Sequence, residues 1–426
     1  MLVSTRWVGS LPRQVFLAKS NLDGTTNGLG LFSAGECRTI PTMDPIYLDH
    51  NATTPVRPEV VEAISRCYRD VCGNPASQHR TGQHARKILE DAREGIAEIL
   101  GANLNGRQPD RVVFTGGATE ANNLAVLGMA QAAGKGPGQL IVSSVEHASV
   151  LEPAEHLLEQ GWQLDTLPVT PDGVVRVDYL DRLVTPQTSL ISVILGNHET
   201  GVLQPVEQLA RLATEHRIAV HTDAVQVAGK LPIDFRKLGV AAMSVSAHKI
   251  GGPPGIGVLV VRHGTWIQPL AFGGHHQWGI RPGTEPVALA VGMCEALRQC
   301  VTQGPEYGRR LAELRDRFEQ GLKASLPGLI VHGSGAERLP QTSNIAFPGV
   351  DSQRMLVALD MAGVACSVGS ACASGSAELS PTLRAMGVLP ELVGCSLRFS
   401  VGWPNTEEEV DEAARRIAEV YRRCRG

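Results

Sequence analysis

Apolar residues recur along this chain with two alternating periods, and the two periods predict helices and strands in turn. Between residues 57 and 305, windows with apolar residues at helical spacing are followed by short, continuous apolar runs of strand length. Helices separated by such strands favour an α/β fold with a mainly parallel sheet covered on both faces, which binds ligands at the carboxyl ends of its strands. The expected helices are 57–69, 81–101, 119–133, 149–160 and 205–216, and the expected strands are Arg111–Thr115, Gln139–Ser143, Ser189–Leu195, Ile218–Thr222, Ala241–Ser246 and Gly257–Val261.

The pattern changes at about residue 305. A long helix is expected first, followed by alternating short segments typical of a smaller α+β unit. The last helix begins with a capping box, Thr406-x-x-Glu409. We therefore expect a large domain over residues 57–305 and a small α+β domain made of residues 43–56 and 306–426. The apolar positions of the two long helices are Tyr307, Leu311, Leu314, Phe318 and Leu322, then Val410, Ala413, Ile417 and Val420.

Residues 1–42 lack this periodicity and are rich in Gly, Ser, Thr and Asn. Three interpretations are open for this N-terminal extension: an arginine-containing organelle presequence, a disordered tail, or a translation start placed too early, with Met43 as the first residue. The abrupt return of pattern after Met43 favours the third. No function is derived from this stretch.

Composition places the chain among ordinary globular proteins. Its 426 residues are 43% hydrophobic and carry a formal charge of −4, which argues against nucleic acid as a direct partner. The longest apolar runs have strand length, far below the roughly 20 residues that span a bilayer, so no membrane partner is expected. The nine cysteines show neither C-x-x-C nor C-x-x-H spacing, which argues against a metal site or a disulfide framework. We expect a soluble protein of the reducing cytoplasm.

Two residues at expected strand ends point to a cofactor with an aldehyde and a pyridine ring. Lys249 ends a buried-looking strand and opens a glycine-rich turn, where a lysine can hold an aldehyde as a Schiff base in a dry pocket. Asp223 follows the neighbouring strand, where a carboxylate can keep a pyridine nitrogen protonated. Alone, each also fits a structural role, as a turn lysine or a helix cap. The pair favours pyridoxal 5'-phosphate.

Two further segments end at the same expected sheet edge. The turn Gly116–Glu120 opens a helix, whose first amides and the Thr119 hydroxyl can bind a phosphate. His147 follows the strand Gln139–Ser143, where an imidazole can stack on a ring and move protons. A lone histidine is often structural, but its place at the shared edge favours a role in the site.

Cys372 and Arg398 lie in the expected small domain. Cys372 stands among Gly, Ser and Ala residues, a setting typical of an accessible loop thiol and unlike that of a core cysteine. Arg398 lies in a strand-like run, where a buried guanidinium has to bind a carboxylate. That carboxylate can belong to a substrate or to a structural salt bridge, and the sequence leaves both open.

Together these residues resemble the cysteine desulfurases, pyridoxal-phosphate-dependent transferases of fold type I within the class V aminotransferase family. The resemblance covers residues 43–426, and the loop Gly369-Ser-Ala-Cys372 is similar to that of group I, the branch of iron–sulfur-cluster and nitrogen-fixation desulfurases. The Arg-x-Gly-His-His-Cys motif of the other branch does not occur in this sequence. The matching motifs are Tyr47–Pro55, Gly73–Pro75, Thr115–Glu120, Glu146-His147, His221–Gln226, Ser246–Lys249 and Arg281–Thr284.

The resemblance implies a role for each site residue. Lys249 would hold the cofactor covalently, Asp223 would bind its pyridine nitrogen, and Gln226 would touch its ring hydroxyl. His147 would stack on the ring, and Cys372 would accept the sulfur. The implied phosphate ligands are Ala118, Thr119, Ser246, His248 and, from the partner subunit of a homodimer, Thr284; the implied ligands of the substrate carboxylate are Arg398 and Asn344.

This chain departs from the family pattern in two places. His198 stands where an asparagine usually binds the ring hydroxyl, and an imidazole can also donate there, so altered tuning is expected and not loss of binding. Gln277 and Trp278 replace a Glu-Arg pair, a change expected to affect subunit or partner contacts more than chemistry.

The predicted activity is conversion of L-cysteine to L-alanine, with the sulfur left as a persulfide on Cys372 and passed to an acceptor protein. The acceptor would be an iron–sulfur scaffold or a tRNA-thiolation carrier. Selenocysteine lyase is the alternative enzyme, because it shares the fold and most of the site. A catalytically inactive homologue that only binds sulfur-transfer proteins is a third possibility, against which the retention of Lys249, Asp223 and Cys372 argues.

Overall fold

The central element is a seven-stranded sheet with the order β2-β8-β7-β6-β5-β3-β4. The computed structural model describes residues 44–132, 136–369 and 379–425, and the extension 1–42 and Cys372 lie outside them. Strand β8 runs antiparallel to both of its neighbours and the other pairs are parallel, so the expected mainly parallel sheet is confirmed. The strands are β2 (Arg111–Thr115), β3 (Gln139–Ser143), β4 (Gln163–Leu167), β5 (Thr188–Ser192), β6 (Ala219–Asp223), β7 (Ala242–Ser246) and β8 (Gly257–Val261).

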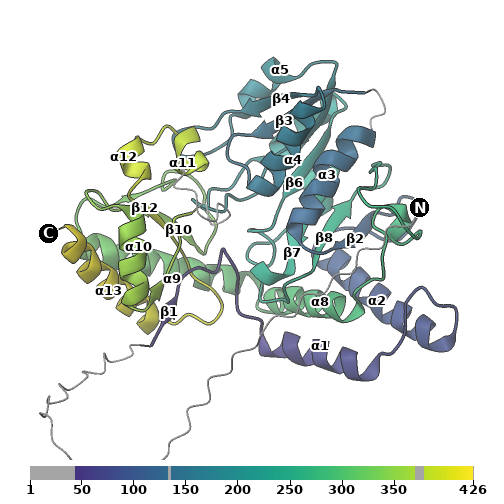
Figure 1. Cartoon of the computed structure of the whole chain (residues 1–426), viewed down its shortest axis with the longest axis horizontal. Helices are drawn as coiled ribbons and strands as arrows, with labels where there is room; N and C mark the ends of the chain where they lie inside the picture. Colours follow the sequence, from purple (N-terminus) through teal and green to yellow (C-terminus); the bar gives the residue numbers. More distant parts are fainter. Residues whose placement is uncertain (1–43, 133–135, 370–378, 426) are drawn as a thin grey trace, which may run out of the picture. The chain divides into compact units, whose positions relative to one another are not determined.

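Helices cover both faces of this sheet, as Figure 1 shows. Side chains of one strand alternate between the two faces. Val113 therefore packs in the cluster beneath α3 and α4, whereas Val112 belongs to the cluster that includes α2 and α8. The helices of this part are α1 (Pro58–Asp70), α2 (Arg80–Ile99), α3 (Ala118–Ala132), α4 (Ala148–Glu159), α5 (Leu180–Leu183), α6 (Val206–Glu215), α7 (Phe235–Leu238) and α8 (Val287–Thr302).

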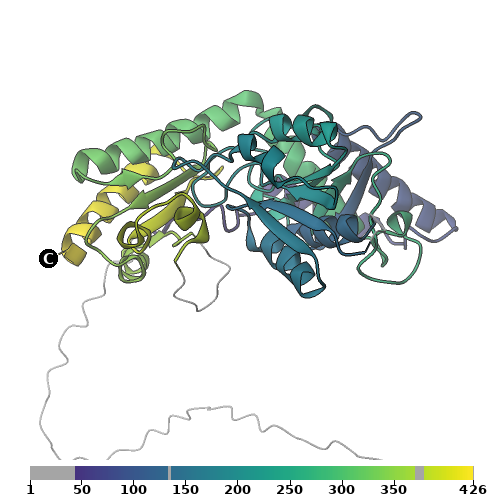
Figure 2. The same cartoon turned by 90° about the horizontal axis from the view of Figure 1, so that it is seen from above.

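Two small sheets lie outside the large one. Strands β12, β10 and β9 form an antiparallel sheet in that order, and β1 pairs in parallel with β11. Figure 2 shows α9 and α13, which pack against each other. These elements are β1 (Ile46–Tyr47), β9 (Ile330–Val331), β10 (Thr342–Ala346), β11 (Val364–Ala365), β12 (Ser396–Ser400), α9 (Gly304–Ser325), α10 (Ser352–Met361), α11 (Pro381–Ala385), α12 (Pro390–Val393) and α13 (Glu407–Arg425).

The capping box before α13 is confirmed by two reciprocal hydrogen bonds. The Thr406 N–H donates to Glu409 Oε2 and the Glu409 N–H donates to Thr406 Oγ1, each over 3.2 Å. The described residues from 44 onward pack as one compact unit, so the division into domains at residues 56 and 306 stays a prediction. None of the helices described is long and apolar enough to cross a membrane.

Candidate active site

A cavity of about 870 Å³ opens at the carboxyl ends of β3, β6 and β7, beside the start of α3. Parallel strands bring their ends to one edge of a sheet, which is why residues far apart in sequence meet here. The cavity brings together most of the residues that the sequence singled out: Ala118, Thr119, His147, His198, Asp223, Gln226, Ser246, His248 and Lys249.

Lys249 lies on one wall of the cavity, in the turn that follows β7. Its Nζ donates to the carbonyl oxygens of Asn51 and Ala52, over 2.6 and 2.7 Å. Both carbonyls belong to the segment after β1, which therefore aims the amine. The neighbouring His248 is neutral near pH 7, because burial and the charges of Lys249 and Lys230 lower its pKa to about 4.

A chain of hydrogen bonds connects Asp223 with His147. The carboxylate of Asp223 accepts from Asn122 Nδ2 over 2.8 Å and from the Val225 N–H over 2.9 Å. Asn122 Nδ2 also donates to Ser149 Oγ over 2.8 Å, and this hydroxyl lies 2.7 Å from His147 Nδ1. Sequence reasoning missed Asn122 and Ser149; their signal was a polar residue on the buried face of an otherwise apolar helix.

The same contacts define the tautomer of His147. The Ser149 N–H can only donate, and it lies 3.1 Å from Nδ1 of the imidazole. Nδ1 is therefore the acceptor, and the neutral ring carries its proton on Nε2.

The anionic end of a ligand would lie at the start of α3. Gly116 and Gly117 lead into this helix, and the nearby Glu120 carboxylate is paired with Arg281 over 2.8 Å. Arg281 therefore offsets the negative charge that would otherwise repel a phosphate. The Ser246 hydroxyl is buried and finds no hydrogen-bond partner in the described part of the chain.

The residues present fit pyridoxal phosphate. Besides Ser246 Oγ, two buried polar atoms at the cavity, Gln226 Oε1 and His198 Nδ1, have no hydrogen-bond partner among the residues described. Buried polar atoms nearly always have a hydrogen-bond partner, so these three atoms are suited to bind a polar ligand in the cavity. A lysine, a fixed carboxylate and a helix N-terminus around one cavity are the groups that an aldehyde, a pyridine nitrogen and a phosphate require.

Arg398 and Asn344 face each other across β12 and β10, next to the cavity but outside its lining. Arg398 forms an ion pair with Asp49 over 2.8 Å, so the structural salt bridge that the sequence left open is present. Its Nη1 also donates to the carbonyl oxygens of His198 and Gly369, each over 3.2 Å. The side-chain amide of Asn344 is buried, and neither of its polar atoms has a hydrogen-bond partner in the described ranges.

Thr284 is exposed and does not line the cavity. That position agrees with its expected role in the site of a partner subunit, which stays a prediction.

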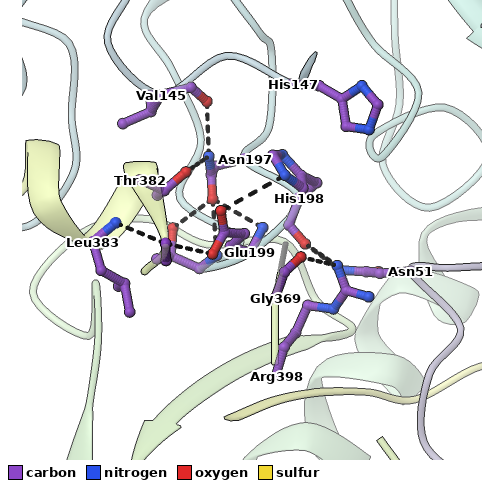
Figure 3. Close-up of polar contacts among 12 residues, drawn as sticks. Asn51, Val145, His147, Asn197, His198, Glu199, Gly369, Thr382, Leu383 and Arg398 are labelled. Carbon is purple, nitrogen blue, oxygen red and sulfur yellow. Dashed lines mark hydrogen bonds and ion pairs between the residues drawn. The ribbon is translucent and has the colours of Figure 1, made fainter. Parts of the chain in front are cut away.

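His198 belongs to a turn that Asn197 holds in place (Figure 3). Asn197 Oδ1 accepts from the backbone N–H groups of Glu199 and Thr200, over 2.9 and 2.8 Å, and its Nδ2 donates to the Val145 carbonyl over 3.0 Å. The His198 ring packs edge-on against His147, with 5.0 Å between ring centroids. Burial, followed by the charges around it, lowers the pKa of His198, which keeps this second imidazole neutral.

The second departure from the family pattern has a structural role in this chain. Gln277 lies beside β2, the edge strand of the large sheet; its Oε1 accepts from the Phe114 N–H over 2.6 Å, and its Nε2 donates to the Phe114 carbonyl over 2.9 Å. The side-chain amide thereby pairs part of an open sheet edge. Gln277 and Trp278 have φ values of 47° and 59°, and Trp278 is 48% exposed.

Known proteins are similar to this chain in sequence and in fold. The family model described as Aminotransferase class-V matches residues 46–413. The cysteine desulfurase IscS of Dictyoglomus turgidum is 40% identical over 380 residues, which cover 88% of this chain and 95% of that protein. The cysteine desulfurase NifS of Azotobacter vinelandii is 36% identical over 383 residues, covering 90% and 94% of the two chains. A solved NifS-like protein superposes with a TM-score of 0.81 at 34% identity, over 88% of this chain and 99% of its own.

Proposed function

This chain belongs to the cysteine desulfurases of the aminotransferase class-V family, and from this premise we propose that it converts L-cysteine to L-alanine and retains the sulfur as a persulfide on Cys372. Its cofactor is pyridoxal phosphate. One observation carries the proposal: Lys249, Asp223 and the start of α3 line one cavity at a single sheet edge. The relatives favour this activity over selenocysteine lyase.

Residues at the strand ends of the seven-stranded sheet, and at the start of α3, bind and orient the cofactor. When bound, pyridoxal phosphate supplies an electron sink for negative charge that develops on the amino acid. Lys249 Nζ would hold the aldehyde, and Asp223, fixed by Asn122, would pair with the pyridine nitrogen. Gln226 and His198 would bind the ring hydroxyl. Ala118, Thr119, Ser246 and His248 would bind the phosphate, together with Thr284 of the partner subunit.

Three residues, Arg398, Asn344 and His147, serve substrate binding and proton transfer. Arg398 and the Asn344 amide bind the carboxylate of L-cysteine, for which Asn344 has hydrogen-bonding capacity that no described residue uses. His147 Nε2 carries the proton that is exchanged with the substrate, because Nδ1 is occupied by the Ser149 N–H.

The sulfur moves to Cys372 without an external oxidant or reductant. The thiolate of Cys372 attacks the substrate sulfur, an S–S bond forms, and the C–S bond breaks with its electron pair on the substrate carbon, which takes up a proton. The products are L-alanine and an enzyme persulfide. The acceptor of this sulfur is an iron–sulfur scaffold, with a tRNA-thiolation carrier as the second candidate.

The test is an assay of purified protein loaded with pyridoxal phosphate. L-cysteine and a thiol reductant should yield alanine and sulfide in equal amounts, and mass spectrometry without reductant should find one added sulfur on Cys372. Faster turnover of selenocysteine with none of cysteine would favour the lyase. A protein that shows no absorbance of a lysine-bound cofactor would instead be an inactive binding homologue.

We further propose a cytoplasmic homodimer. The loop region before Thr284 exposes several large apolar side chains, which a second copy would cover: Trp266, Phe272 and Trp278 are 82%, 87% and 48% exposed. Light scattering should give twice the chain mass, and Thr284→Ala should weaken cofactor binding without changing that mass.

A further inference from the structure

Glu199 lies between the two ends of the segment that carries Cys372. In sequence, this segment is bounded by Gly369 on one side and by Ser380 on the other. The Ser380 hydroxyl donates to Glu199 Oε2 over 2.6 Å. The same oxygen lies 2.6 Å from where a Cβ on Gly369 would stand, so backbone and carboxylate are in direct contact. One carboxylate thus contacts both ends.

The Gly369 end is also bonded to the turn that holds Glu199. Arg398 Nη1 donates to the Gly369 carbonyl and to the His198 carbonyl, each over 3.2 Å (Figure 3). Gly369 has φ of 98°, a value that favours glycine, and any larger residue would collide with Glu199. The positive φ and the close approach of Glu199 together explain why residue 369 is a glycine.

The Ser380 end is held by a hydroxyl with two functions. Ser380 Oγ accepts from the Leu383 N–H over 3.0 Å, which caps α11, while its hydrogen goes to Glu199. Thr382 in the same helix lies 3.5 Å from Asn197 Nδ2. The start of α11 is therefore attached to the turn of residues 197–201.

Burying the Glu199 carboxyl group at this position costs free energy. It is 2% exposed, and burial raises the pKa of its carboxyl although the Ser380 and Thr382 hydroxyls act in the opposite direction. An amide or apolar residue would avoid the cost of burying an acid. The position of Glu199 against both segment ends provides a reason for a side chain of this length that ends in a hydrogen-bond acceptor.

We propose that Glu199 is a positioning residue for sulfur transfer, which ties both ends of the Cys372 segment to the turn that presents His198 to the cavity. The inference rests on the proposed role of Cys372 as sulfur acceptor. A displaced nucleophile loses rate steeply, by roughly 100-fold for an error of about 1 Å. Glu199 does not itself line the cavity, although its carboxylate lies 3.8 Å from His198 Nε2, so its loss should slow transfer more than it weakens cofactor binding.

The test compares Glu199→Ala with Glu199→Gln in the holoenzyme. The alanine variant should exchange amide hydrogens faster at residues 365–369 and 379–386, and should form the Cys372 persulfide about 10- to 100-fold more slowly in a single turnover. Its spectroscopic Kd for L-cysteine should stay within about twofold. Gln should restore transfer to within about threefold, because its amide oxygen still accepts from Ser380. Glu337→Ala, at an exposed carboxylate, is the matched control.

A second pair of variants separates capping from attachment. Ser380→Asp and Ser380→Asn both supply an oxygen that caps α11, but only Asn can also donate to Glu199. Asp should therefore reproduce the slow transfer of Glu199→Ala and melt at a lower temperature than Asn, because two buried carboxylates in contact repel each other, whereas Asn should keep transfer near the wild-type rate.

Each result bears on a separate claim. If Glu199→Ala changes neither hydrogen exchange nor persulfide formation, or weakens cysteine binding as much as transfer, the positioning role is wrong. Faster exchange with an unchanged transfer rate also contradicts it. If the wild-type enzyme forms no persulfide on Cys372, the proposed function fails, and hydrogen exchange still decides whether Glu199 holds the segment ends.

Discussion

The candidate active site has two sides that are built in different ways: one lines the cavity, and the other lies beside it. The large-sheet wall consists of the strand ends and helix start that present Lys249, Asp223, His147 and Thr119. The small-sheet wall lies beside the cavity and outside its lining; it holds Arg398, Asn344 and the ends of the Cys372 segment, and it comes from two antiparallel strands and their loops. The first is positioned by a continuous sheet of seven strands. The second is positioned by a sheet of three strands, together with single ion pairs and hydrogen bonds between distant elements.

This difference separates binding from transfer. Changes in the large-sheet wall should remove the cofactor or its orientation, because those side chains hold the ring and phosphate. Changes in the small-sheet wall should leave the cofactor bound and impair substrate capture or sulfur transfer.

The largest effect is expected from Lys249→Ala. Activity should fall by roughly 10⁴-fold or more, as when a nucleophile is removed from a group of residues that act as a unit. The absorbance of the lysine-bound cofactor should disappear, while circular dichroism stays unchanged. Lys237→Ala, at an exposed lysine, is the control. Trapping of the cofactor with hydride on any other lysine would show that the large-sheet wall has been misassigned.

Cys372→Ala tests the opposite wall. Sulfide release should drop by about 1,000-fold or more, while the cofactor spectrum and its response to L-cysteine remain those of the wild type. Cys366→Ala is the matched variant, since burial raises the pKa of the Cys366 thiol and keeps it protonated. A persulfide mapped to Cys366 would reverse the assignment.

Substitution of two asparagines, one from each wall, should affect different properties: stability for Asn122 and substrate binding for Asn344. Asn122→Ala removes a donor from the buried Asp223 carboxylate, and the free energy of unfolding should fall by about 3 kcal/mol. Asn344→Ala breaks no hydrogen bond among the described residues, so stability should hold while KM for L-cysteine rises about 10-fold. Denaturant melts and steady-state kinetics give both numbers. Equal losses of stability would contradict the distinction.

The smallest expected effect concerns pH. Burial is the main cause that raises the pKa of Glu146 to about 8, against opposing hydrogen bonds from Ser143 and Ile194 and with a small contribution from Asp223. A raised folded-state pKa contributes stability that is complete below the unfolded pKa and is lost as pH rises through the folded value. The free energy of unfolding should therefore fall by about 2 kcal/mol between pH 6 and 8.

Glu146→Gln should flatten this dependence, because the amide does not titrate in that range. Chemical denaturation of the holoenzyme at several pH values measures the slope. A wild-type slope equal to that of the Gln variant would mean that Glu146 is ionised in the folded protein.

The sequence by itself determined most of the large-sheet wall. Strand ends such as those before Asp223 and Lys249 are marked locally, by an apolar run that stops at a polar residue, and parallel pairing then brings them to one edge. Four elements of this region were not predicted: α8, β4 and the two four-residue helices α5 and α7. The helix Val287–Thr302 is apolar on almost every side, so it lacks a 3.6-residue period, and β4 mixes polar residues into an edge strand.

The contacts that build the small-sheet wall could not be predicted from the sequence, although Arg398, Asn344 and Cys372 could be singled out there. Arg398 and Asp49 are 349 positions apart, and Glu199 lies 181 positions from Ser380. Such contacts leave no periodicity in the sequence, because each depends on where whole elements pack and not on the residues nearby. The sequence could identify Arg398 as a buried cation in need of a carboxylate, but the identity of its partner, and the position of Glu199 between Gly369 and Ser380, follow from the packing of elements far apart in the chain.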